Sequence, residues 1–294
     1  MLPRTELGKS KHVSPLTCVG IPYATSVTKK VEKEMAYVLY TNTVGKIDTL
    51  ILFRHGHTPG NEFIDSSDPI QRTIEQQRKD FDDYNMDLDQ EGEFDAVMVG
   101  HALSTTALSV CVASPFLRTR RTPEIAFEQR DIPIVLERDV RERNLGKFAY
   151  VTRPDFHAYY PEVADYKTEN PLDWVPDGDE SLGIARGESL REVGHRVVTA
   201  LQRQVARLDI PTRILPVSTH ADVLISLLGH PQFGNMSNKA LQQPLGPIAN
   251  PQWIQNGDIH CWDGLNNNDE FTKHRVISYR GGYDTGWLQR GRDY

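Results

Sequence analysis

The sequence has few cysteines and no long apolar run. Its three cysteines, Cys18, Cys111 and Cys261, are odd in number and far apart, so neither a disulfide framework nor a Cys-x-x-Cys metal pair is expected. Such usage is typical of a reducing compartment. No run reaches the roughly 18 apolar residues of a membrane-spanning helix, and the first residues lack the apolar stretch of a secretory signal. We therefore expect a cytoplasmic protein with no membrane partner.

The chain also lacks an excess of positive charge. Its formal net charge is -7, whereas proteins that bind nucleic acid need a basic face, so nucleic acid is not an expected partner. A negative protein can still bind phosphate when its cations gather in one pocket. The hydrophobic content of 38% and the charged content of 25% are those of a globular protein, and 294 residues suffice for a large core.

One segment combines a predicted buried strand with reactive side chains. Residues 48–61 begin with an apolar run bounded by polar residues, which is typical of a buried strand. The turn that follows contains Arg54, His55, two glycines and a proline. In an open α/β sheet, ligands bind beyond the carboxyl ends of the strands. An Arg-His pair there places a fixed cation beside an imidazole that can act as a nucleophile.

The turn itself, Arg-His-Gly-His-Thr-Pro-Gly-Asn over residues 54–61, resembles the RHGxTxxN signature of the histidine phosphatase superfamily, the phosphoglycerate-mutase-like group. In that family the histidine attacks a phosphoryl group and becomes a phosphohistidine. The resemblance implies an α/β fold, a three-layer α/β/α sandwich with a mainly parallel central sheet. It implies that His55 is the nucleophile, that Arg54 is the first phosphate clamp, and that Thr58 and Asn61 orient phosphate or substrate.

Two downstream motifs resemble the family in the same order. Ser114-x-x-x-Arg118-x-x-x-Thr122 is similar to the family's Ser-Pro-x-x-Arg-x-x-x-Thr, which implies that Arg118 is the second phosphate clamp. His220 follows a predicted strand, as the family's second histidine does, and would hydrogen-bond the phosphoryl oxygens. Ala221 replaces the glycine that the family usually has at this position, and the resemblance implies that it would lie beside the phosphate.

A third motif provides a candidate general acid. Residues 141–148, Arg-Glu-Arg-Asn-Leu-Gly-Lys-Phe, resemble the family's Glu-x-x-x-Gly-x-Trp/Phe stretch, which implies Glu142, with Glu137 as the alternative. A catalytic glutamic acid needs a raised pKa, and two flanking arginines would lower it if they lay close. Residues 88–97 resemble a further family segment, with Asp95 where glutamine is usual, and His57 is expected at the rim.

The chain is expected to divide into three parts. Residues 1–46 would form an N-terminal extension, residues 47–280 the catalytic domain with a flap over 150–186, and residues 281–294 a C-terminal tail. Apolar residues at spacings of three and four predict a helix over 188–208, which would begin at Gly187-Glu188-Ser189. Two late strands are expected near 258–262 and 275–279.

These features predict hydrolysis of a phosphomonoester, a small phosphorylated metabolite, through phosphohistidine and without metal or cofactor. One alternative is a phosphoglycerate-mutase-type phosphoryl transfer. Mutases of the family carry a Glu-Ser-x-Trp-Asn continuation and a Leu-Asn-Glu-Arg-His-Tyr-Gly segment, neither of which occurs here, and this favours the phosphatase. A second alternative is a non-catalytic protein that binds a phosphorylated ligand. A homodimer is left open.

Overall fold

A mixed β-sheet lies at the centre of the structure, a computed structural model that describes residues 47–65, 83–149, 151–237, 241, 254–266, 270–285 and 288–289. Its strands lie in the order β3-β2-β4-β1-β5-β6-β7, and β8 pairs with β6. The strands are β1 (Thr49–Arg54), β2 (Cys111–Ala113), β3 (Ile134–Leu136), β4 (Ile214–Thr219), β5 (Ile259–Leu265), β6 (Phe271–Ser278), β7 (Tyr283–Asp284) and β8 (Leu288–Gln289).

The sheet is parallel in one half and antiparallel in the other. Strands β3, β2, β4 and β1 run parallel to their neighbours, whereas β1–β5, β5–β6 and β6–β7 are antiparallel pairs. The predicted late strands are β5 and β6, and both are longer than expected. Because parallel strands end at one edge of the sheet, the residues that follow β1, β2 and β4 come together there.

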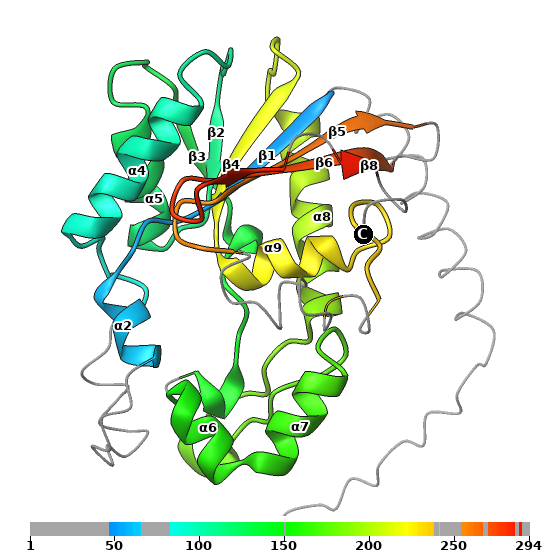
Figure 1. Cartoon of the computed structure of the whole chain (residues 1–294). Helices are drawn as coiled ribbons and strands as arrows, with labels where there is room; N and C mark the ends of the chain where they lie inside the picture. Colours follow the sequence, from blue (N-terminus) through cyan, green and yellow to red (C-terminus); the bar gives the residue numbers. More distant parts are fainter. Residues whose placement is uncertain are drawn as a thin grey trace, which may run out of the picture. The chain divides into compact units, whose positions relative to one another are not determined.

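Helices cover both faces of the sheet (Figure 1). Leu50 and Leu52 of β1 belong to the apolar cluster that includes α8 (Leu190–Arg207) and α9 (Ala221–Leu228). Ile51 and Phe53 point to the opposite face, where they pack with α4 (Gln90–Ala102) and the C-terminal end of α5 (Leu117–Ala126). Alternate residues of a strand face opposite sides of the sheet. The predicted three-layer α/β/α sandwich is confirmed, but its sheet is mixed and not mainly parallel, because the short connections between β5, β6 and β7 permit only antiparallel pairing.

The predicted helix over 188–208 is α8, and its start has a clear physical cause. The Ser189 hydroxyl accepts a hydrogen bond from the backbone N–H of Glu192, at 3.2 Å, while the Glu192 carboxylate accepts one from the Ser189 N–H, at 2.8 Å. This capping box satisfies two backbone donors at the helix N-terminus.

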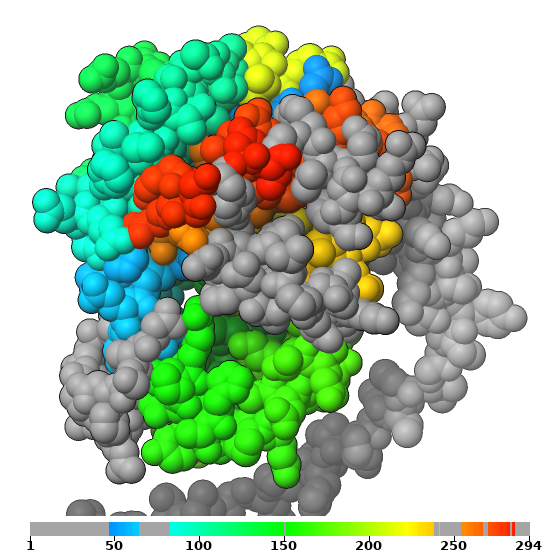
Figure 2. Space-filling model, in the orientation of Figure 1, coloured from blue at the N-terminus to red at the C-terminus, as the bar shows by residue number. Residues whose placement is uncertain are grey.

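The segment expected to form a flap is a small helical unit. It contains α6 (Arg153–Tyr159), α7 (Pro161–Glu169) and the short 3-10 helix η4 (Glu180–Leu182). Its own apolar cluster is formed by Phe148, Phe156, Ala164 and Trp174. Helix α6 contacts α2 (Pro59–Asp65), which begins directly after the Arg-His turn, and Figure 2 shows α2 and the green flap side by side.

The expected division of the chain into three parts stays a prediction. The N-terminal extension, residues 1–46, lies outside the described residues. The segment assigned to a C-terminal tail contains β7 and β8, which both pair with β6, so the sheet extends further than expected. None of the helices in the described ranges is long and apolar enough to cross a membrane.

Candidate active site

The two histidines singled out in the sequence lie together at the carboxyl edge of the sheet. His55 follows β1, and His220 follows the neighbouring parallel strand β4. Their ring centroids are 5.3 Å apart, with an angle of 67° between the rings. Both side chains are buried. The parallel pairing of β1 with β4 therefore brings together two histidines that are 165 positions apart in the sequence.

The tautomer of His55 follows from its two hydrogen bonds. Nδ1–H donates to the carbonyl oxygen of Gly56, at 2.7 Å, and Nε2 accepts from Nε of Arg118, at 3.2 Å. Burial, followed by the charges of Arg118 and Arg54, holds the pKa of His55 well below its usual value. The ring is therefore neutral, and its Nε2 lone pair faces the guanidinium of Arg118.

The two arginines approach this site from different elements. Arg118 lies in the first turn of α5, is 5% exposed, and donates through Nη1 to the backbone and side-chain oxygens of Asp83, at 2.6 and 2.9 Å. Arg54 ends β1 and donates through Nη1 to the carbonyl of Ile254, at 2.9 Å. Its buried Nε has no partner among the described residues. Burial lowers the pKa of Arg54, but the guanidinium remains a cation.

His220 is held by one ring nitrogen. Its Nε2 lies 2.8 Å from the hydroxyl of Ser114, which follows β2. Its Nδ1 is buried, makes no hydrogen bond in the part of the chain that is described, and lies 3.9 Å from a carboxyl oxygen of Glu142. Burial and the charge of Arg118 hold the pKa of His220 well below its usual value. Ala221 begins α9, and its side chain packs against the apolar core.

Glu142 has the electrostatic character of a general acid. Burial, followed by the negative charge of Asp222, raises its pKa to about 8. The side chains of the flanking arginines diverge from it. Arg141 pairs with Asp139 and Glu188, and Arg143 donates to backbone carbonyls. Burial and Asp222 therefore outweigh the lowering of the Glu142 pKa that two adjacent cations would cause.

Glu137, the alternative acid, is committed elsewhere. Its carboxylate accepts hydrogen bonds from Arg203 and Gln204 of α8, and its pKa is lowered by hydrogen bonds, chiefly from the backbone N–H of Asp139, which outweigh the effect of burial. It is therefore ionised and tied to the helix, while Glu142 lies beside His220.

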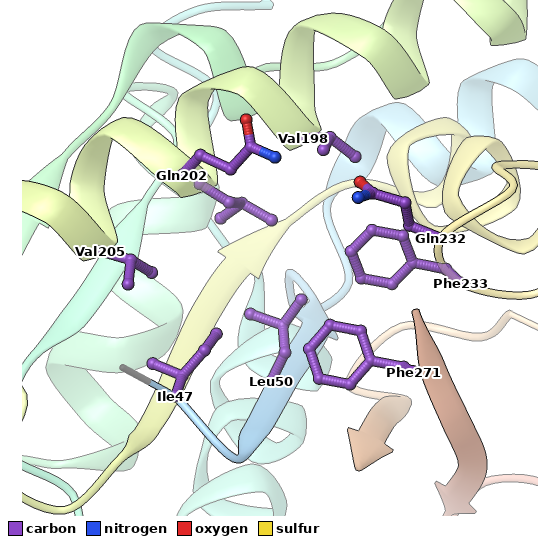
Figure 3. A pocket seen from close by; sticks show the side chains of 9 residues that line it. Ile47, Leu50, Val198, Gln202, Val205, Gln232, Phe233 and Phe271 are labelled. Carbon is purple, nitrogen blue, oxygen red and sulfur yellow. The ribbon is translucent and has the colours of Figure 1, made fainter. Parts of the chain in front are cut away.

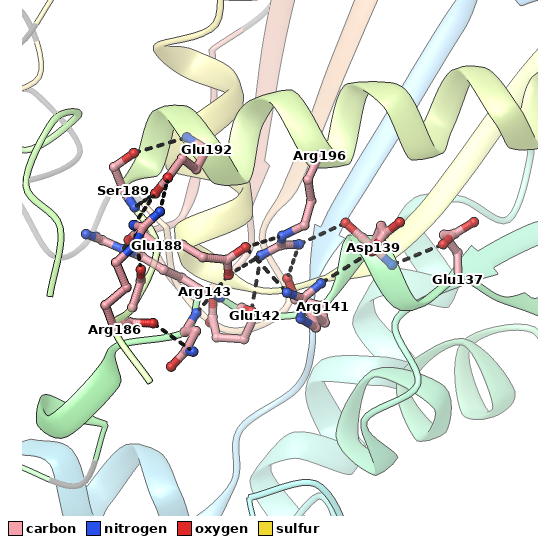
Figure 4. Close-up of polar contacts among 12 residues, drawn as sticks. Glu137, Asp139, Arg141, Glu142, Arg143, Arg186, Glu188, Ser189, Glu192 and Arg196 are labelled. Carbon is pink, nitrogen blue, oxygen red and sulfur yellow. Dashed lines mark hydrogen bonds and ion pairs between the residues drawn. The ribbon is translucent and has the colours of Figure 1, made fainter. Parts of the chain in front are cut away.

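A clamp on α8 fixes the backbone that bears Glu142 (Figure 4). The guanidinium of Arg196 donates to the carbonyls of Asp139, Arg141 and Glu142, at 2.8, 3.1 and 3.3 Å. The carboxylate of Glu188 accepts two hydrogen bonds from the same guanidinium, at 2.7 and 2.9 Å. A planar guanidinium held bidentately has a fixed orientation, so the Glu188–Arg196 pair sets the course of the acid-bearing loop.

Thr58 and Asn61 lie next to the nucleophile but bind one another. The amide and the hydroxyl of Thr58 both donate to the Asn61 side-chain oxygen, at 3.0 Å each. Asn256 donates to this oxygen and to the carbonyl of His55, at 3.3 and 3.0 Å. These contacts hold the turn; phosphate binding by Thr58 and Asn61 stays a prediction.

Several polar residues of the site were missed in the sequence. Asn256 comes from the segment before β5, which carries no motif, and Asp222 stands two residues after His220, outside the motifs named above. Asp83, which is paired with Arg118, likewise stands in no motif. His57, expected at the rim, is partly buried and places Nδ1 2.6 Å from the carboxylate of Asp89. Only Ser114 could have been found, because it opens the motif that contains Arg118.

Two other features of the described residues lie apart from this polar site. An apolar cavity of about 30 Å³ between the sheet and α8 is lined by Leu50, Val205, Phe233 and Phe271, among others (Figure 3). In the described ranges, no group of three or more His, Cys, Asp or Glu side chains could hold a metal ion.

The comparisons with known proteins agree on one family. The model of the histidine phosphatase superfamily (branch 1) matches residues 50–244. The chain is 28% identical over 141 residues to a probable phosphoglycerate mutase GpmB of Erwinia tasmaniensis, covering 48% of this chain and 60% of that protein. It is 25% identical over 136 residues to a probable 2-carboxy-D-arabinitol-1-phosphatase of Arabidopsis thaliana, covering 46% of this chain and 26% of that protein. The matches thus span less than two thirds of either relative.

Solved structures share the fold. A mycobacterial glucosyl-3-phosphoglycerate phosphatase aligns with a TM-score of 0.54 and 19% identity, over 74% of this chain and 92% of that chain. A putative alpha-ribazole-5'-P phosphatase of Escherichia coli aligns with a TM-score of 0.54 and 18% identity, over 79% and 95%.

Proposed function

Because the chain belongs to the histidine phosphatase superfamily, we propose that it hydrolyses a phosphomonoester through a phosphohistidine formed on Nε2 of His55. The single observation that carries this proposal is the fixed tautomer of His55. Its Nδ1–H is bound by the Gly56 carbonyl and its Nε2 is free of a proton, 3.2 Å from Arg118 Nε. A neutral imidazole with one committed nitrogen is the form that attacks phosphorus.

The first chemical step uses the neighbouring groups as follows. Nε2 of His55 attacks the phosphorus in line, the N–P bond forms and the P–O bond to the leaving group breaks. Arg54, Arg118 and His220 bind the phosphoryl oxygens, whose charge spreads in the transition state. Glu142, whose pKa of about 8 keeps it protonated at neutral pH, donates its proton to the leaving oxygen.

The second step reverses the role of Glu142. The ionised carboxylate takes a proton from water, the water oxygen attacks phosphorus, and the N–P bond breaks. Inorganic phosphate leaves and His55 returns to its neutral form. Glu142 is again protonated, so both steps balance without a further reactant.

Substitution of the nucleophile tests this mechanism. Wild type, His55→Ala and the control His101→Ala, at an exposed helical histidine, would be assayed on a panel of small phosphorylated metabolites. Wild type and the control are expected to release phosphate and His55→Ala to release none. Wild type quenched during turnover should carry an acid-labile phosphoryl group that His55→Ala lacks. Turnover retained in His55→Ala would refute the mechanism.

The same assay separates the alternative functions. Incubation with phosphoglycerate and a bisphosphoglycerate primer would yield the isomeric phosphoglycerate from a mutase and free phosphate from a phosphatase. A non-catalytic protein would bind phosphorylated ligands without turnover on the whole panel. One relative is named as a probable phosphatase and another as a probable mutase, so both enzyme classes are relevant. The absence of the mutase-type segments from this sequence favours hydrolysis.

A further inference from the structure

The turn that follows His55 is in direct backbone contact with the start of α4. A Cβ added to Gly56 would lie 2.2 Å from the carbonyl oxygen of Gly92, and one added to Gly92 would lie 2.0 Å from the carbonyl oxygen of His57. Only glycine permits two backbones to approach so closely. The position of the nucleophile's turn therefore depends on α4.

One buried carboxylate of α4 binds this turn. Asp95 is fully buried, and its Oδ2 accepts a hydrogen bond from the backbone N–H of His57, at 2.8 Å. That N–H belongs to the same peptide unit as the Gly56 carbonyl, which accepts the Nδ1–H of His55 at 2.7 Å. The trans peptide presents its N–H and its C=O in opposite directions. A continuous chain of hydrogen bonds thus runs from Asp95 through one peptide to His55.

The carboxylate is in turn bound by a cation from the far end of the chain. Arg280, in the turn after β6, donates through Nε to Oδ1 of Asp95, at 2.8 Å, and its Nη2 lies 2.7 Å from the same oxygen. Arg280 also pairs with Glu91 and donates to the Tyr279 hydroxyl. Because one carboxyl oxygen faces the arginine and the other faces the turn, the orientation of Asp95 is determined.

We propose that Asp95, kept in its charged form by Arg280, orients and polarises His55 through the Gly56–His57 peptide. This inference rests on the proposed function, in which His55 is the nucleophile. In hydrolases with a Ser-His-Asp triad, an aspartate binds the histidine Nδ1–H directly and selects its tautomer. Here a peptide stands between the two groups. Hydrogen bonds in such a chain polarise one another in a low-dielectric interior.

The electrostatics of Asp95 agree with this role. Burial raises its pKa to about 6, while the His57 amide and Arg280 oppose the rise. Without the arginine the carboxyl group would protonate more readily and would accept a weaker hydrogen bond from the amide. Asp95 and Arg280 are thus positioning residues: neither contacts the reacting phosphorus, and both act through His55.

Three variants separate positioning from a general loss of structure. Asp95→Asn keeps an oxygen that can accept from the His57 amide, whereas Asp95→Leu, which has the same number and branching of side-chain heavy atoms, removes the acceptor. Arg280→Met removes the cation. The matched control is Arg275→Met, which breaks an ion pair with Asp284 on neighbouring strands and has no contact with Asp95.

The first readout is the rate of His55 phosphorylation by p-nitrophenyl phosphate in single turnovers, with inorganic phosphate as the probe of binding. Asp95→Leu should slow phosphorylation at least tenfold and change the dissociation constant of inorganic phosphate less than twofold. Asp95→Asn should lose less than tenfold, and the control should match wild type. Equal rates in wild type and a folded Asp95→Leu variant would overturn the proposal.

The second readout needs no turnover. Imidazole 15N spectra report which ring nitrogen of His55 carries the proton. Wild type and Asp95→Asn should show the Nδ1–H form alone, and Asp95→Leu a mixture of tautomers. An unchanged tautomer in Asp95→Leu would overturn the inference even if no substrate were hydrolysed. This outcome is distinct from failure of the proposed function, which would appear as a wild type that forms no phosphohistidine.

A double-mutant cycle covers the case in which Asp95→Leu does not fold. Arg280→Met should slow phosphorylation by at least fivefold in wild type, yet have no effect in the Asp95→Asn background, where no charge needs a counter-ion. Additive effects of the two substitutions would show that Arg280 does not act through Asp95.

Discussion

Replacing Glu142 with glutamine should make the protein more stable and a poorer catalyst. Glutamate ordinarily titrates near 4.5, whereas burial and Asp222 raise the pKa of Glu142 to about 8. Between these two values the folded protein holds a proton that the unfolded chain releases. The free energy of unfolding therefore falls as the pH rises through this window.

The size of this effect follows from the pKa. Each pKa unit corresponds to about 1.4 kcal/mol, so the penalty reaches about 3 kcal/mol at pH 7 and stays below about 1 kcal/mol at pH 5. Glutamine carries no such proton, and its carbonyl can keep the hydrogen bond from the Arg143 amide, now 2.9 Å long. The stabilisation by Glu142→Gln should thus grow from pH 5 to pH 7 by about 2 kcal/mol.

Urea unfolding at both pH values measures the stability difference, with the exposed Glu162→Gln on α7 as the control. Turnover should move in the opposite direction. For alkyl phosphates, whose leaving oxygen needs a proton, loss of the general acid should lower kcat by about 100-fold or more. For p-nitrophenyl phosphate the loss should be smaller. If Glu142→Gln did not stabilise the protein, or stabilised it equally at pH 5 and pH 7, the conclusion that folded Glu142 keeps its proton would be refuted.

Three further predictions concern other parts of the structure. Arg196→Met should lower the free energy of unfolding by about 3 kcal/mol, because it removes both hydrogen bonds from the Arg196 guanidinium to the half-buried Glu188 carboxylate, and it should also lower kcat. Arg207→Met, at an exposed position of the same helix, should change neither quantity. Equal effects of the two substitutions in urea unfolding and activity assays would contradict the clamp. Gly92→Ala should lower kcat at least tenfold, because the new methyl would lie 2.0 Å from the His57 carbonyl; normal kinetics in the variant would rule out this close contact. His260→Phe should make acid unfolding begin at lower pH. Burial lowers the pKa of His260 from 6.5 to about 3, so the free energy of unfolding is highest above pH 6.5 and falls as the pH falls and the unfolded chain binds the proton. An unchanged acid-unfolding curve would contradict this account.

Much of the fold could be predicted because it follows from local patterns. The apolar run Leu50–Phe53 predicts a central strand, and the three-and-four spacing after Ser189 predicts α8. Each signal depends on residues close in sequence, since strand alternation and helical periodicity are local properties. The segments between elements carried weaker signals, and the aromatic cluster that holds the flap together was not foreseen.

The candidate site likewise contains residues that the sequence predicted and residues that it did not. The residues that bear the proposed chemistry, His55, Arg118, Glu142 and His220, stand in short motifs and were found from them. The residues that hold these side chains in place, such as Asn256 and Arg280, stand in no motif, because a single hydrogen bond from a distant segment leaves no periodic trace in the sequence.

The sequence by itself determined which reactive side chains follow which strands, and hence that two imidazoles and two guanidiniums would meet at one edge of a sheet. Only the tertiary structure decided their protonation and their supports. The pKa of Glu142 depends on burial and on Asp222. The position of the proton on Nδ1 of His55 depends on the Gly56–His57 peptide, which Asp95 of α4 binds. Both are properties of distance and dielectric environment, which exist only once the chain has folded.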